Sequence, residues 1–157
     1  MSWIVYADSF SSDNFNNFNL LQPVIFSENT VLNYARAWVV MYNAPSFTNL
    51  SMKIFSYNLS SLKGGLLYTS TNAWTLPQIT TEDNAIKEIY FEFNKIPLSK
   101  DNTYYFSIGG TGATFTSSSH VAWKKAYPDP IYTTNVNTTY TSMGTNPYEI
   151  YFVGSKL

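Results

Sequence analysis

A two-residue alternation of apolar and polar side chains in residues 87–93 constrains the fold more than any other feature of the sequence. One side of this segment carries only large apolar residues, which are Ile89, Phe91 and Phe93. The other side carries charged residues and a tyrosine, which are Glu88, Tyr90 and Glu92. Because successive side chains of a β-strand point to opposite faces, the pattern predicts a strand with one dry face.

A second segment, residues 103–110, repeats the alternation. Its apolar set is Tyr104, Phe106 and Ile108. We expect the strand to end at the pair Gly109 and Gly110, since glycine accepts a positive φ without steric cost. The proline, polar and charged residues of segment 94–102 predict a turn between the two strands. These two strands are therefore expected to form the core on which the rest of the chain packs.

Six further segments have the composition of strands, which are residues 20–26, 31–42, 50–57, 66–71, 119–124 and 148–154. The first is expected at a sheet edge because Pro23 cannot donate a ladder hydrogen bond. The second is apolar on both faces over its second half, which suits a central strand or a strand covered by a second subunit. Residues 60–65 and 72–85 are predicted to be loops, and no segment has the pattern of an amphipathic helix.

About eight short strands with Gly and Pro turns predict an all-β fold, an antiparallel two-sheet β-sandwich. A jelly roll is favoured over an immunoglobulin-like sandwich, because the connections are long and the Cys-Trp-Cys and tyrosine-corner signals are missing.

The length of 157 residues suits one domain. Residues 20–157 are predicted to form this single β-sandwich domain, and residues 1–19 an N-terminal arm or a first loop. Three widely spaced aromatic residues make this segment a candidate docking element. They are Phe10, Phe15 and Phe18. Either they pack on their own domain or they bury their rings against a neighbouring molecule.

The charge content excludes one class of partner. Only 12% of the residues are charged, the formal net charge is −1, and Arg36 is the single arginine. Because phosphate binding requires clustered basic residues, no nucleic-acid partner is expected. The sequence contains no cysteine, no secretory signal and no apolar run of the roughly 20 residues that a membrane span requires. We therefore expect no membrane insertion, and release by lysis rather than export.

No catalytic residue is predicted. The only histidine, His120, is expected in mid-strand, and strand neighbours such as Ser119 point to the opposite face. Glu88 and Glu92 share a strand face, as the paired carboxylates of a glycosidase would. This face is expected to be the more solvent-exposed face of the strand, where solvated glutamates are normal.

No metal site and no cofactor is predicted either. Hard cations prefer oxygen ligands, which Glu82, Asp83, Asp8 and Asp13 would supply. No calcium-loop pattern connects them, so a calcium site cannot be placed.

The most informative feature of the composition is its high aromatic content, which is 18% of the chain and includes thirteen tyrosines. Five are expected in the core, which are Phe91, Phe93, Tyr104, Phe106 and Phe152. Four others lie in predicted loops and are candidates for contact with a glycan or a partner. These four are Trp74, Tyr127, Tyr132 and Tyr140. Trp123 suits either role.

Residues 102–112, 121–132 and 147–154 resemble β-sandwich domains of tailed-bacteriophage virion proteins, and also jelly-roll carbohydrate-binding modules. The first resemblance implies a non-enzymatic structural protein of the capsid-decoration, head-fibre or tail-fibre type. Such a protein is commonly a homotrimer that contacts other virion proteins, assembles in the host cytoplasm and is displayed on the virion. The second resemblance implies a module that contacts cell-surface glycans through loop aromatics. Both hypotheses remain open at this stage.

Overall fold

The computed structural model describes residues 7–9, 21–26, 28–42, 49–58, 62–75, 86–111, 120–124 and 150–156. Over these ranges the chain forms two antiparallel sheets of five strands each, without a helix. In this part of the chain, accordingly, no helix has the length and apolarity to cross a membrane. The all-β, two-sheet prediction is confirmed as a β-sandwich-like fold.

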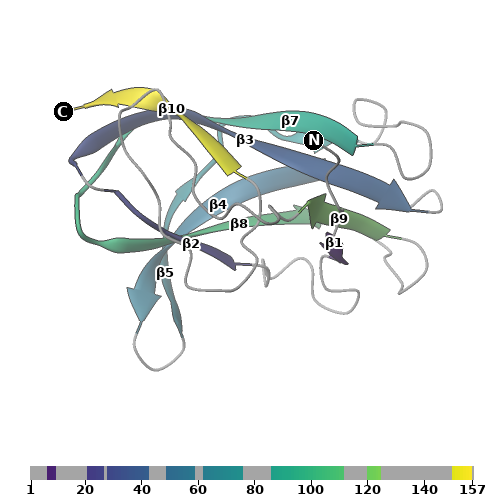
Figure 1. Cartoon of the computed structure of the whole chain (residues 1–157), viewed down its shortest axis with the longest axis horizontal. Helices are drawn as coiled ribbons and strands as arrows, with labels where there is room; N and C mark the ends of the chain where they lie inside the picture. Colours follow the sequence, from purple (N-terminus) through teal and green to yellow (C-terminus); the bar gives the residue numbers. More distant parts are fainter. Residues whose placement is uncertain are drawn as a thin grey trace, which may run out of the picture.

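The first sheet is built around β3 (Thr30–Tyr42), which pairs with β7 (Ile86–Leu98) along one side. The other side of β3 is shared by β10 (Ile150–Lys156) and β9 (His120–Lys124). A short strand, β1 (Ala7–Ser9), pairs with the far side of β9. In Figure 1, β3 and β7 run along the upper part of the molecule. The predicted central position of β3 is confirmed.

The second sheet has β8 (Thr103–Thr111) between β2 (Leu21–Ile25) and β4 (Asn49–Asn58). The other side of β4 pairs with β5 (Leu62–Thr69) and β6 (Trp74–Thr75). Within the described chain β2 pairs only with β8, so the predicted edge strand at Pro23 is confirmed. The ends of β4 and β5 project at the lower left of Figure 1.

Alternate side chains of the two sheets meet in one buried cluster. The five aromatic residues predicted for the core all belong to it, and Trp123 joins them with no exposed surface. Phe26, in the connection between β2 and β3, packs against Phe152 with ring centroids 5.2 Å apart and against Phe106 at 6.5 Å. Because a buried aromatic side chain stabilises the fold by roughly 2 kcal/mol, this cluster supplies a large share of the stability.

Two connections cross between the sheets at the same end of the molecule. One is the β2–β3 connection and the other is the turn from β7 to β8 at residues 99–102. They are joined because the backbone N–H of Asp101 donates to the carbonyl oxygen of Phe26 at 3.1 Å. The backbone N–H of Lys100 donates to Oδ1 of Asn29 at 2.9 Å. The two crossovers thus form one rigid corner.

The prediction of a turn over residues 94–102 is wrong in its first half, because β7 continues to Leu98. Asn94 and Lys95 have φ values of 54° and 61° and form a bulge where the register with β3 shifts. The polar residues that suggested a turn therefore lie in a bulge, and Pro97 is accommodated in a strand at the margin of the sheet.

The predicted loops are also partly ordered into sheet structure. Strand β5 begins at Leu62, inside the predicted loop 60–65. Residues 70–74, which we call the edge strap, bond along the free edge of β7. The backbone N–H of Thr71 donates to the carbonyl oxygen of Glu92 at 2.7 Å, and the backbone N–H of Glu92 donates to Oδ1 of Asn72 at 2.7 Å. The strap thereby covers a sheet edge that would otherwise present unpaired backbone groups.

Candidate ligand-binding cleft

A half-open cleft of about 730 Å³ lies beside the corner where the chain crosses between the sheets. Its walls come from β4, β5, the end of β7, the 99–102 turn and the start of β8. The lining residues are Ser56, Tyr57, Leu67, Tyr68, Pro97, Ser99, Asp101, Asn102, Thr103 and Tyr104. A volume of this size accepts a small organic ligand or one to a few residues of a polymer.

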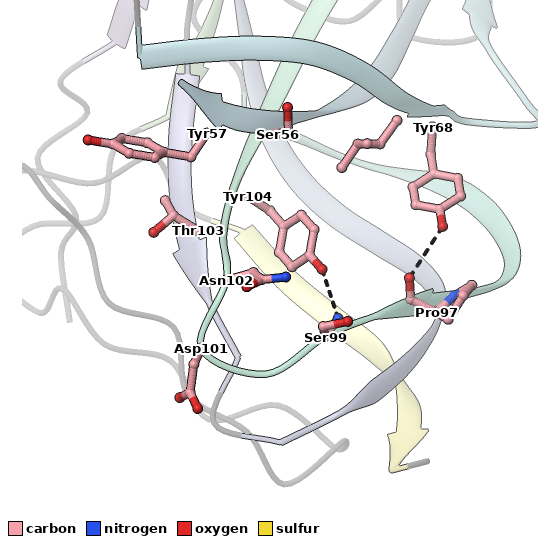
Figure 2. A pocket seen from close by; sticks show the side chains of 10 residues that line it. Ser56, Tyr57, Tyr68, Pro97, Ser99, Asp101, Asn102, Thr103 and Tyr104 are labelled. Atoms are coloured by element: carbon pink, nitrogen blue, oxygen red, sulfur yellow. Dashed lines mark hydrogen bonds between the residues drawn. The ribbon is translucent and has the colours of Figure 1, made fainter. Parts of the chain in front are cut away.

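Two tyrosines of the cleft are held in place by their hydroxyl groups. The backbone N–H of Ser99 donates to the hydroxyl oxygen of Tyr104 at 2.8 Å, and the hydroxyl of Tyr68 donates to the carbonyl oxygen of Pro97 at 3.4 Å. Figure 2 shows both rings pointing from their strands toward the segment that contains Pro97 and Ser99. Tyr104 is only 7% exposed, whereas Tyr68 is partly buried against the core. These rings are therefore fixed walls.

The third tyrosine, Tyr57, lines the cleft from β4 and is 41% exposed, and in Figure 2 its ring points away from those of Tyr104 and Tyr68. Its ring stacks on that of Tyr105, with centroids 6.2 Å apart and an interplanar angle of 24°. Tyr105 is buried with Phe55 in a small cluster separate from the main core. This burial raises the pKa of the Tyr105 hydroxyl, and the neighbouring Tyr57 raises it further. Tyr57 therefore packs on the buried Tyr105, while its own ring remains accessible.

The corner turn, residues 99–102, lines one side of the cleft. Asp101 adopts the left-handed conformation, with φ of 66°, which Asp tolerates better than most residues. The hydrogen bonds of Asp101 to Phe26 and of Lys100 to Asn29 tie this turn to the β2–β3 connection. The polar side chains of the turn, including Asn102, are thus presented on a fixed backbone.

The cleft groups aromatic side chains with hydrogen-bonding groups, all but one of which are neutral. Its polar side chains are two serines, a threonine, an asparagine and one aspartate. Such a surface stacks on a flat apolar face and hydrogen-bonds with the hydroxyl groups around it.

Of the four loop aromatics predicted to contact a glycan or partner, only Trp74 lies in the described chain. It is half-buried in β6, its indole N–H donates to the carbonyl oxygen of Tyr90, and it packs against the core. Trp74 does not line the cleft. The other three, Tyr127, Tyr132 and Tyr140, lie outside the described residues, so their predicted role stays a prediction.

The predicted docking residues Phe10, Phe15 and Phe18 also lie outside the described residues. Three residues of the predicted arm, Ala7–Ser9, form β1 and pair with β9. An experiment on the arm must therefore preserve this strand.

Of the residues weighed for chemistry, Glu88 and Glu92 do not line the cleft. His120 is the first residue of β9, not a mid-strand residue, with Tyr42 opposite it on β3. Glu88 and Glu92 are exposed, as predicted, and Glu88 pairs with Arg36 at 3.5 Å between Nε and Oε1. Over the described ranges, no group of three or more His, Asp or Glu lies together in a way that suits a metal ion.

Sequence reasoning missed the tyrosines of the cleft. Tyr104 was assigned to the core, which is correct for its ring, and Tyr57 and Tyr68 stood at ordinary strand positions. No local signal unites them, because they come from three different strands. Comparisons of the chain with protein-family models, with curated proteins and with solved structures gave no match.

Proposed function

We propose that the chain is a non-enzymatic binding protein whose cleft contacts a glycan. The observation that carries this proposal is that Tyr57, Tyr68 and Tyr104 line one open cleft together with several polar side chains. A sugar ring has an apolar face of C–H groups and a periphery of hydroxyls. The tyrosine rings suit the apolar face of the sugar, while polar side chains such as Ser56 and Asn102 suit its hydroxyls.

The hydrogen bonds made by two tyrosine hydroxyls support a binding role for the cleft. Those of Tyr68 and Tyr104 are bonded to backbone atoms of the neighbouring segment, so they hold the rings in position. Because walls fixed in advance lose little conformational freedom when a ligand arrives, this arrangement favours affinity.

The proposed setting is the surface of a phage virion, where a jelly-roll protein of the capsid-decoration, head-fibre or tail-fibre type presents the cleft. The segments that resemble such proteins contribute β8, an inner strand of the second sheet, and β10, which pairs with β3. A low charge content also suits a protein in a fixed assembly. In this proposal the protein is a homotrimer, and Phe10, Phe15 and Phe18 dock on other virion proteins.

The glycan contact is tested by the variants Tyr57→Ala and Tyr90→Ala on an array of cell-surface oligosaccharides. The two tyrosines are similarly exposed, at 41% and 44%, but only Tyr57 lines the cleft. Loss of one stacking ring should weaken binding about fivefold or more, since a ring contact contributes about 1 kcal/mol beyond its buried area. Tyr90→Ala should bind like the wild type. Equal binding by all three proteins, or no oligosaccharide bound by the wild type, would overturn the glycan contact.

The virion setting is tested separately, by replacing Phe10, Phe15 and Phe18 with serine and leaving β1 intact. The variant should keep the circular dichroism spectrum of the wild type and lose its incorporation into particles. Light scattering should give the wild-type protein the mass of a trimer. A monomer, or particles that retain the triple variant, would contradict this setting without affecting the cleft.

A further inference from the structure

The residues that line the cleft carry charge of one sign only. Of the ten described residues that line it, Asp101 is the only Asp or Glu, and none is Lys, Arg or His. An anionic ligand would therefore meet a negative charge in the cleft and no lining cation to balance it. A neutral saccharide meets no such penalty.

The backbone that carries this charge is fixed. The N–H of Asp101 is bonded to the carbonyl oxygen of Phe26, and the preceding N–H, of Lys100, is bonded to Asn29. In Figure 2 the carboxylate lies at the outer edge of the cleft, away from the ring of Tyr104. Asp101 therefore lines the cleft with its charge at the rim.

We propose that the cleft selects uncharged saccharides over anionic ones, and that Asp101 at its rim sets this preference. The inference rests on the proposed glycan contact and adds its ligand class. Two like charges 4–8 Å apart in water repel each other enough to change an equilibrium constant roughly two- to sixfold. Because a rim charge is solvated, the preference should fall when salt shortens the Debye length from about 10 Å at 0.1 M to about 3 Å at 1 M.

The experiment uses an array on which each neutral oligosaccharide is paired with a derivative that adds one carboxylate or sulfate. The readout is the ratio of the two affinities within a pair, so an effect common to both members cancels. We expect the wild type to prefer the neutral member roughly 1.5- to threefold at about 0.1 M salt, because screening reduces the unscreened value, and less at about 1 M. Asp101→Asn should bring the ratio close to one.

Two further variants make the result specific. Asp101→Gly removes the same charge, and glycine adopts the left-handed backbone of this position without strain, so it should give the same ratio as Asp101→Asn. Lys100→Gln changes a charge in the same turn at a residue that does not line the cleft, and should keep the preference for neutral members. Equal binding of neutral and acidic members by the wild type, or a preference that survives both Asp101 variants, would overturn this inference while the glycan contact stands. Binding of neither class would overturn the glycan contact itself.

Discussion

The indole N–H of Trp74 donates a hydrogen bond to the backbone carbonyl oxygen of Tyr90, and the two rings meet nearly at right angles with centroids 5.3 Å apart. Trp74 belongs to the second sheet and Tyr90 to the first, so this contact joins the two sheets at their margin. It follows that Trp74, a candidate glycan contact by sequence, has a structural task in the edge strap.

Replacing Trp74 tests this task. Trp74→Ala should lower the free energy of unfolding by about 2–3 kcal/mol, below the range for a fully buried ring because Trp74 is only half-buried. Trp74→Phe keeps most of the packing and should lower it by about 1 kcal/mol or less, since Asn72 also donates to the carbonyl oxygen of Tyr90. Urea unfolding measures both. Unchanged stability together with lost glycan binding would instead support the prediction from sequence.

Asn72 takes the place of a neighbouring strand along β7. Its amide nitrogen donates to the carbonyl oxygen of Tyr90 at 3.1 Å, and its Oδ1 accepts from the backbone N–H of Glu92. Asn72→Ala should lower the free energy of unfolding by about 1 kcal/mol and speed hydrogen exchange at the amide of Glu92. Asn72→Asp retains the acceptor and should keep that amide protected. Equal exchange in all three proteins would show that the strap does not protect this edge.

The strands were predictable because alternation is a local property of the sequence. Phe91 and Phe106 point inward for the same reason that Glu92 points outward, and the structure confirms both. The bulge at Asn94 and Lys95 was not predictable, since two polar residues with a positive φ resemble a turn until the register with β3 is known.

The cleft was out of reach of sequence reasoning for a related reason. Tyr57, Tyr68 and Tyr104 are separated by up to 47 positions and meet only because β4 lies between β5 and β8 in the second sheet. The order of strands is set by pairing between segments that lie far apart in the sequence. No periodicity within one strand encodes this order.

Two serine hydroxyls form a matched pair for a stability experiment. Ser107 is fully buried and its hydroxyl has no hydrogen-bond partner, whereas the hydroxyl of Ser70 accepts from the backbone N–H of Met52 at 3.1 Å and donates to the carbonyl oxygen of Asn72 at 2.8 Å. Ser107→Ala removes an unsatisfied group and should raise the free energy of unfolding by up to about 1 kcal/mol. Ser70→Ala should lower it by about 1–2 kcal/mol. A loss of stability in Ser107→Ala would mean that its hydroxyl is satisfied in solution.

Burial of Tyr105 predicts a dependence of stability on pH. Because burial and the nearby Tyr57 raise the pKa of Tyr105 in the folded chain, its contribution is fully present below its unfolded pKa of about 10 and is lost as the pH rises through the folded pKa. The fall in the free energy of unfolding between about pH 8 and about pH 11 should therefore be smaller in Tyr105→Phe than in the wild type. Tyr90→Phe serves as the control at an exposed position. An equal fall in all three proteins would contradict the shift.

Gly64 and Gly65 are adjacent in β5, yet only the first is tightly enclosed. A Cβ atom at Gly64 would lie 2.4 Å from Oγ and 2.9 Å from the backbone oxygen of Ser56, whereas a Cβ at Gly65 would meet nothing within 4 Å. The hydroxyl can rotate away, but the backbone oxygen belongs to β4 and moves only with the strand. Gly64→Ala should therefore lower the free energy of unfolding by about 1–3 kcal/mol, and Gly65→Ala should leave it unchanged or raise it by up to about 1 kcal/mol.

The same pair of glycines links the packing of β5 to the cleft. Ser56 lines the cleft, so a shift of Ser56 in Gly64→Ala should also weaken glycan binding, measured by titration at a temperature where the variant is folded. Gly65→Ala should bind like the wild type, because its new methyl group points into open space. Full binding by a destabilised Gly64→Ala would show that Ser56 contributes nothing to the ligand contact and would restrict the site to the tyrosine rings and the corner turn.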